Sequence, residues 1–417
     1  MIDKEVIMAG KLKVALVGTG IRGSTMWGKT VKDNYSDVVE FVGLCDINPK
    51  RLAFSKSYIG VSCPTFLDFD DMVVTTKPDT VIVTTVDCFH AKYACRAMEL
   101  GCDVILEKPM ATDEKMCQEI LDTERRTGKK VTVTFNARYG APAVRIKEML
   151  SSDDLGEITS VDFSWYLDTD HGASYFRRWH GLKQKSGSLL VHKATHHFDM
   201  MNWWLDAEPV EVNAWGDLRH YGFNGPYRGE RCMNCQEKGT CPYFWDITTN
   251  DFLMNLYVKC ESEDGYIRDN CLYRKEINIW DTMSLKVRYH TDILMSYSLN
   301  ACMPYEGYKV SFNGTKGRFD ARVFSRQPWD VDGIAEFRMT PLFSKNSRTF
   351  TLQSGDPGGH GGADPKLQDM IFRGPRPDPY GQAAGTRDGA LSILIGIAAR
   401  RSIEQERPIF IEELVKM

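Results

Sequence analysis

A short segment near the middle of the chain, residues 189–204 (LLVHKATHHFDMMNWW), places three histidines and a lysine within six positions. If the segment is helical, His192 and His196 lie one turn apart and Asp199 falls on the same stripe. A His-x3-His pair on one helical face can bind zinc. Histidine also handles protons near neutral pH, because its ordinary pKa is about 6.5. The segment is therefore a metal site, a proton-handling site or a structural polar helix.

A glycine-rich turn follows the first apolar run of the chain, residues 11–17 (KLKVALV). Gly18, Gly20 and Gly23 have the GxGxxG spacing. That spacing permits a tight turn and lets backbone N–H groups approach a pyrophosphate at a helix N-terminus. A glycine turn that binds no ligand is the alternative, but the strand before it and the helix after it favour a dinucleotide site.

An acidic residue, Asp46, ends the next strand-like run, 28 residues after Gly18. A carboxylate at this place accepts hydrogen bonds from ribose hydroxyls and repels a 2′-phosphate. NAD is therefore expected rather than NADP, and the nearby cations Lys50 and Arg51 weaken that preference.

The elements that must position these residues alternate through the first third of the chain. Near-continuous apolar strands between amphipathic helices predict a parallel sheet covered on both faces. Lys108, in the tripeptide Glu107-Lys108-Pro109, follows one of these strands at the carboxyl edge, where such sheets bind ligands. A lysine at a strand end is otherwise a solvated cap. From residue 158 onward, several segments alternate in polarity and predict a second, antiparallel sheet.

Length and charge limit the class of protein. A chain of 417 residues is long enough for two domains, and its net charge of −4 gives no basic field for a nucleic acid partner. No apolar run approaches the roughly 20 residues that cross a bilayer. The first residues lack a signal-peptide pattern, so no membrane partner and a cytoplasmic location are expected.

Several motifs together resemble the Gfo/Idh/MocA family, the glucose–fructose oxidoreductase and inositol dehydrogenase relatives. They are GTGIRG, EKP, FNARY and LLVHKATHHFDMM, and the resemblance covers nearly the whole chain. The most specific element is EKP placed one βα unit before FNxRY.

The resemblance implies an α/β Rossmann domain over residues 1–136, followed by an α+β domain over residues 137–417 with a large, mostly antiparallel open sheet. It also implies a homodimer or homotetramer, and a C-terminal helix that packs back on the first domain. The residues expected to bind the cofactor are Gly18, Gly20, Ile21, Arg22, Gly23, Asp46, Arg51, Thr85, His90, Glu107, Lys108 and Asn136.

In the family, the EKP lysine and a histidine of a D-x-G-x-H helix converge over the nicotinamide, and here these are Lys108 and His196. The chain departs from the pattern at the aspartate, which is His192, and at the glycine, which is Ala194. We expect His196 to accept the hydroxyl proton, Lys108 to donate a hydrogen bond to the reacting oxygen, and His192 to orient or relay. The charge of Lys108 disfavours a metal here, and so does the long reach to a third ligand, Asp199.

A substrate side is expected from aromatic and basic residues just before the histidine segment and after the first domain. Aromatic faces stack on sugar rings and arginines grip hydroxyls or carboxylates, although residues 171–181 can also be a surface loop. No phosphate-gripping cluster stands outside the cofactor loop, which favours an uncharged polyol or glycoside. The predicted substrate contacts are Arg138, Tyr139, Arg178, Trp179, His180, Lys193 and Asp199.

Three cysteines, Cys232, Cys235 and Cys241, lie close together in the second half of the chain. They could hold a structural metal, with Cys260 or Cys271 as a fourth ligand, form a disulfide pair or remain free thiols.

The leading hypothesis for function is an NAD-dependent dehydrogenase that oxidises a secondary hydroxyl of a sugar, glycoside or polyol. The alternative is an NAD-retaining glycosidase that works through a transient keto-sugar with no net redox change. A third reading, an NAD-binding regulator, is disfavoured by the intact Lys108 and His196.

Overall fold

The first sheet of the computed structural model is parallel and has six strands in the order β3-β2-β1-β4-β5-β6. The structure describes residues 10–226, 229–329, 333–353, 359–374 and 376–417. Helices cover both faces, and for that reason β1 and β4 are apolar and buried over most of their length. The strands are β1 (Leu12–Val17), β2 (Val39–Cys45), β3 (Thr65–Phe66), β4 (Thr80–Val83), β5 (Asp103–Leu106) and β6 (Val131–Val133).

The helices of this first domain follow its strands in turn. The helix after the glycine turn has a π-helical stretch, η1 (Gly23–Thr30), which continues into α1 (Val31–Tyr35). The others are α2 (Pro49–Ile59), α3 (Phe69–Thr76), α4 (His90–Glu99) and α5 (Glu114–Thr127).

The second sheet has nine strands in the order β14-β13-β12-β11-β7-β10-β9-β8-β15, and all neighbours are antiparallel except β7 and β10. Strict alternation of buried and exposed residues in β9 shows that only one face is covered. Both sheets together confirm the predicted fold class. The strands are β7 (Ile158–Asp168), β8 (Pro209–Asp217), β9 (Thr282–Tyr289), β10 (Leu294–Met303), β11 (Glu306–Gly314), β12 (Gly317–Ser325), β13 (Ile334–Pro341), β14 (Arg348–Gln353) and β15 (Ile409–Phe410).

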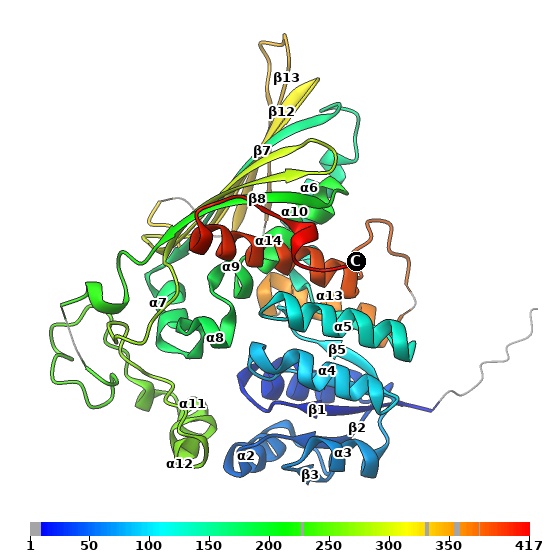
Figure 1. Ribbon diagram of the computed structural model, residues 1–417, viewed down its shortest axis with the longest axis vertical. Coiled ribbons are helices and arrows are strands. Elements are labelled where there is room, and N and C mark those ends of the chain that lie inside the picture. The colour runs from blue at the N-terminus through cyan, green and yellow to red at the C-terminus, as the bar shows by residue number, and fades with distance from the viewer. Residues whose placement is uncertain (1–9, 227–228, 330–332, 354–358, 375) are drawn as a thin grey trace, which may run out of the picture.

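Helices fill the space between the two sheets, as Figure 1 shows for α10 and α14. Gly389 of α14 lies so close to the first domain that a Cβ atom there would stand 2.8 Å from Met110 Sδ and 3.0 Å from Val133 Cγ2. In the described part of the chain, no helix has the length and apolarity to span a membrane. Apart from α11 and α12, which are described below, the helices that follow the first domain are α6 (Ala141–Leu150), α7 (Thr169–Arg177), α8 (Lys183–Ser186), α9 (Leu189–His192), α10 (Thr195–Leu205), α13 (Gly359–Phe372) and α14 (Thr386–Gln405).

A long connection between β8 and β9, residues 218–281, returns to the first domain, and we call it the bridging segment. It carries α11 (Asp251–Leu256) and α12 (Glu261–Asp264), which lie beside α2 in Figure 1. The Asn48 side-chain amide donates to the carbonyl oxygen of Cys260 over 2.9 Å. The Phe252 ring packs against Tyr58 with centroids 4.7 Å apart. The bridging segment therefore packs against α2 of the first domain.

Candidate active site

A cavity of about 1580 Å³ lies at the carboxyl ends of β1, β4 and β5, bounded by the α9–α10 region and the bridging segment. Of the residues predicted to bind a cofactor, all except Gly23 line it. Of the predicted catalytic and substrate residues, those that line it are Lys108, His192, His196, Arg178, Trp179, His180 and Lys193.

The glycine turn has the close approaches that its spacing predicts. Gly18 has a φ of 91°, and a Cβ atom there would lie 2.7 Å from the carbonyl carbon of Thr84. A Cβ atom on Gly23 would lie 2.1 Å from the carbonyl oxygen of Gly18. Gly23 therefore closes the turn by packing rather than by facing the cavity. The cradle left in front of Gly18 and Gly20 fits a dinucleotide pyrophosphate.

The carboxylate of Asp46 is held in one orientation at the cavity wall. Its Oδ2 accepts from the backbone N–H and the hydroxyl of Thr19 at 2.7 and 2.9 Å, and its Oδ1 accepts from the backbone N–H of Asn48 at 2.9 Å. Arg51 lies farther away, with Nη1 3.5 Å from Oδ1. This position at the end of β2 is the one from which a carboxylate reaches ribose hydroxyls.

Two other predicted cofactor residues use their side chains to hold the strand-end loops. Glu107 Oε1 accepts from Arg22 Nε at 2.6 Å and from Trp27 Nε1 at 2.7 Å. The ring nitrogens of His90 lie 2.8 Å from the carbonyl oxygen of Pro109 and 3.2 Å from that of Thr85. Both residues border the cavity, and both rigidify the loops around it.

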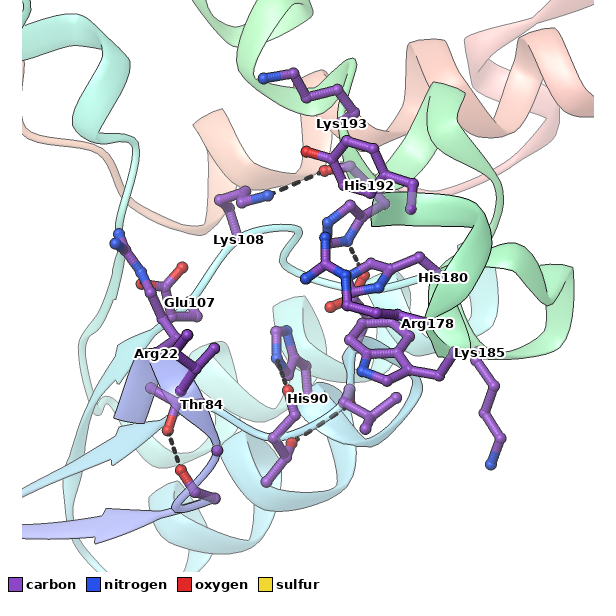
Figure 2. A pocket seen from close by; sticks show the side chains of 18 of the residues that line it. Arg22, Thr84, His90, Glu107, Lys108, Arg178, His180, Lys185, His192 and Lys193 are labelled. Carbon is purple, nitrogen blue, oxygen red and sulfur yellow. Dashed lines mark hydrogen bonds and ion pairs between the residues drawn. The ribbon is translucent and has the colours of Figure 1, made fainter. Parts of the chain in front are cut away.

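Lys108 reaches across from the first domain to the second. Its Nζ donates to the main-chain carbonyl oxygen of His192 over 3.2 Å, as Figure 2 shows. Burial lowers the pKa of Lys108 to about 8, although the charges of Asp87 and Glu107 oppose that shift. A cationic donor is thus placed next to the histidine segment.

His192 has a partner that sequence analysis missed. Its Nδ1 lies 2.5 Å from Oδ2 of Asp87, a buried residue of η2 (Asp87–Phe89) just after β4. Burial, followed by the charge of Lys108, holds the pKa of His192 well below 6.5. A ring that donates from Nδ1 to a carboxylate keeps Nε2 free to accept a proton. Asp87 follows the buried strand β4 by four residues and so lies at the carboxyl edge of the sheet. That position could have identified it as a site residue from the sequence.

His196 lines the same cavity from the first turn of α10. Its Nδ1 is buried and has no hydrogen-bond partner among the described residues. Burial, and then the charges of Lys108 and Lys193, hold the pKa of His196 well below 6.5. The ring is therefore neutral at pH 7 and able to accept a proton.

Three predicted substrate contacts lie elsewhere, and the structure corrects these predictions. Arg138 pairs with Asp199 through two contacts of 2.6 and 2.9 Å, and it also meets Asp388 at 2.9 Å. The side chains of Arg138 and Asp199 are only 3% and 1% exposed. Tyr139 is buried against the first domain's core. None of the three lines the cavity, because Arg138 and Asp199 pair with each other and Tyr139 packs into the core.

The cysteine cluster does not gather into a metal site. In the described ranges, no group of three His, Cys, Asp or Glu side chains is placed to hold a metal ion. All twelve cysteines are free thiols, and Cys232 Sγ lies 2.8 Å from Arg177 Nη1. Likewise, the histidines of α9 and α10 form no such group with other described residues.

Two family models match the chain and together span most of it. Residues 12–135 match the oxidoreductase family with an NAD-binding Rossmann fold, and residues 147–411 match the C-terminal alpha/beta domain of that family. With this fold and this cavity, the chain belongs to the Gfo/Idh/MocA oxidoreductase family, and the predicted resemblance is confirmed.

Individual relatives agree with that assignment. A Bacillus subtilis (strain 168) protein named "Putative oxidoreductase YteT" is 37% identical over 426 residues, 97% of this chain and 99% of that protein. A "Glycosyl hydrolase family 109 protein" of Shewanella pealeana is 23% identical over 94% of this chain and 82% of its own length. The solved structure of a levoglucosan dehydrogenase with NADH and levoglucosan has a TM-score of 0.68 at 18% identity, covering 96% of this chain and 100% of that one.

Proposed function

We propose that the protein oxidises a secondary hydroxyl of a sugar, glycoside or polyol, with NAD as the hydride acceptor. One observation carries the proposal: Lys108 from the first domain and His196 from the second border the same cavity as the glycine turn. The levoglucosan dehydrogenase of the same fold is consistent with a carbohydrate substrate.

The residues of the chain divide the work of such a reaction. Bound nicotinamide supplies the hydride acceptor. Lys108 donates a hydrogen bond to the reacting oxygen and stabilises its developing negative charge. His196 takes the hydroxyl proton, and its lowered pKa keeps it available as a base. The Asp87–His192 pair is a second proton acceptor close to Lys108.

The preference for NAD is supported by the pairing of two nearby cations. Arg51 Nη2 lies 2.8 Å from Asp264 Oδ2, and Lys50 Nζ lies 2.8 Å from Glu263 Oε1. Both acids belong to the bridging segment. Because these cations already have counterions, they offer little to a 2′-phosphate, while Asp46 repels one.

The test is direct. Purified protein is incubated with NAD and a panel of inositols, glucosides, galactosides and hexuronides, and the absorbance of reduced nicotinamide is followed. We expect stoichiometric reduction with at least one sugar. No reduction with any member, together with tight NAD binding, would refute the dehydrogenase.

An NAD-retaining glycosidase is the second candidate, and the Asp87–His192 pair is the observation that favours it. Glycoside cleavage through a keto-sugar needs more proton transfers than a simple oxidation, and a second acid–base pair could supply them. The relative named as a glycosyl hydrolase family 109 protein is consistent with it. Chromogenic glycosides distinguish the two, since aglycone release without accumulation of reduced cofactor identifies the glycosidase.

Self-association through the second sheet is part of the same proposal. The face of this sheet that the helices leave open carries Trp215 of β8 and Leu294 of β10, which are 60% and 57% exposed. A second copy would bury them, and light scattering should give a mass of two or four chains.

A further inference from the structure

We propose that the substrate carries a carboxylate, as a hexuronic acid or its glycoside does, and that Arg178 binds that group in the cavity that Lys108 also borders. This inference rests on the proposed function and narrows its substrate class. Arg178 borders the cavity and has no ion-pair partner among the described residues, so a ligand anion would supply one.

Arg178 extends from the end of α7 into the cavity. Its Nε donates to the carbonyl oxygen of Ser174 at 2.9 Å, and its guanidinium lies over the Tyr175 ring, 5.3 Å from the centroid. Within the described residues, no carboxylate lies within ion-pair distance of it. Figure 2 shows the guanidinium beside the rings of His180 and His192, on the cavity side. The fork of an arginine in this position matches a carboxylate bidentately.

Arg268, from the bridging segment, is the second cation. It is 8% exposed, and its Nε is buried with no hydrogen-bond partner in the described part of the chain. Its guanidinium rests on the rings of Trp245 and Tyr257, at 5.7 and 5.6 Å. The hydroxyl of Tyr257 accepts from the backbone N–H of Ile21 in the glycine turn at 2.9 Å, so Arg268 lies toward the coenzyme end of the cavity. Arg178 is therefore the arginine that we assign to the substrate.

The acids near this site already have partners. Asp87 holds His192, and Glu306 contacts His171 at 2.9 Å and Arg326 at 3.7 Å. Lys193, on another wall of the cavity, also has no ion pair among the described residues, and its Nζ lies 5.0 Å from the Trp165 ring centroid. The substrate end of the cavity is therefore positively charged and can accept an anion.

A carboxylate fits better than a phosphate. Phosphate sites usually add backbone N–H groups from a glycine loop or a helix N-terminus. Arg178 instead lies on the Tyr175 ring, and its single planar fork satisfies both oxygens of a carboxylate.

The experiment compares matched sugars with the intact protein and NAD. Methyl glucoside is paired with methyl glucuronide, methyl galactoside with methyl galacturonide, and glucose 6-phosphate is the third arm. We expect kcat/KM for a uronide to exceed that of its neutral partner by about tenfold or more. Equal use of the neutral sugar, or a preference for the phosphate, would overturn the inference.

Variants then locate the anion site. Arg178→Gln should lower kcat/KM for the uronide by about 10- to 100-fold and leave NADH affinity within about twofold. Lys185→Gln is the matched control, because in Figure 2 this lysine of the same cavity rim points away from the other labelled cations. If Arg178→Gln instead weakens NADH binding and leaves the uronide unaffected, the arginine serves the coenzyme's pyrophosphate and the inference fails.

A binding measurement separates this inference from the proposed function. Glucuronate and galacturonate are titrated into the NADH complex by calorimetry, with glucose as the neutral control. Binding that depends on Arg178 without turnover of any sugar would sustain the anion site and refute the dehydrogenase. Turnover of neutral sugars without uronate binding would support the dehydrogenase and refute the anion site.

Discussion

The two ends of the cavity treat their cations differently. At the coenzyme end, Arg22 contacts Glu107 at 2.6 Å and Asp364 at 3.1 Å, and Arg51 contacts Asp264 at 2.8 Å. At the substrate end, Arg178 and Lys193 have no such partners among the described residues, although they line the same space.

This difference separates cations that position loops from cations that are available to bind a ligand. A buried cation with its own carboxylate fixes the shape of a loop and has little attraction left for a ligand. A buried cation without one carries an uncompensated desolvation cost, which a bound anion removes. We therefore expect the coenzyme end to bind phosphate through backbone N–H groups and the substrate end to bind its ligand through side-chain charge.

The largest expected effect is that of removing the cation that we place at the reacting oxygen. Lys108→Ala should lower kcat by about 10³-fold, because the developing alkoxide loses its charged donor. NADH affinity, measured by fluorescence, should stay within a few-fold. Turnover that survives this change would move the reaction to another part of the cavity.

A paired cation should behave as a structural element. Arg138→Gln leaves the buried carboxylate of Asp199 without its main counterion, and we expect the free energy of unfolding to fall by about 3–5 kcal/mol. Denaturant unfolding followed by circular dichroism measures this loss. Unchanged stability combined with a raised KM for the sugar would restore the substrate role for Arg138.

The pairing at the coenzyme end can be undone to change selectivity. Asp264→Asn frees Arg51, and we expect the ratio of kcat/KM for NADP to that for NAD to rise about tenfold. Glu261→Gln is the matched control, because this acid of the same helix pairs with Arg231 instead. An equal rise in both variants would show that general loss of negative charge is responsible.

The smallest effect is the response of the wild-type protein to pH. Lys108 acts in its charged form, which is present below its pKa of about 8, so kcat should be halved near that pH and fall further above it. The lowered pKa of His196 keeps this base neutral down to acidic pH, so the acid limb should lie below 6.5. Initial rates across the pH range at saturating substrate give both limbs. A rate that keeps rising above pH 9 would contradict the role of Lys108.

Local spacing was enough to predict several residues that meet at one edge of the first sheet. Gly18, Asp46 and Lys108 each stand at the end of an apolar strand, and strand ends of a parallel sheet share one edge. Partners distant in sequence were not predictable in this way. Asp87 meets His192 across 105 positions, and Arg138 meets Asp199 across 61. Considered separately, Arg138 and Asp199 were each predicted to contact the substrate. In the structure they form an ion pair with each other.

The bridging segment has a consequence for how coenzyme choice is inferred in such proteins. The sequence of the first domain alone has Asp46 next to two basic residues, Lys50 and Arg51. That sequence leaves the choice between NAD and NADP ambiguous. The carboxylates that pair with those bases, Glu263 and Asp264, are encoded in the other half of the gene. Replacing the first domain alone would therefore separate Lys50 and Arg51 from these partners.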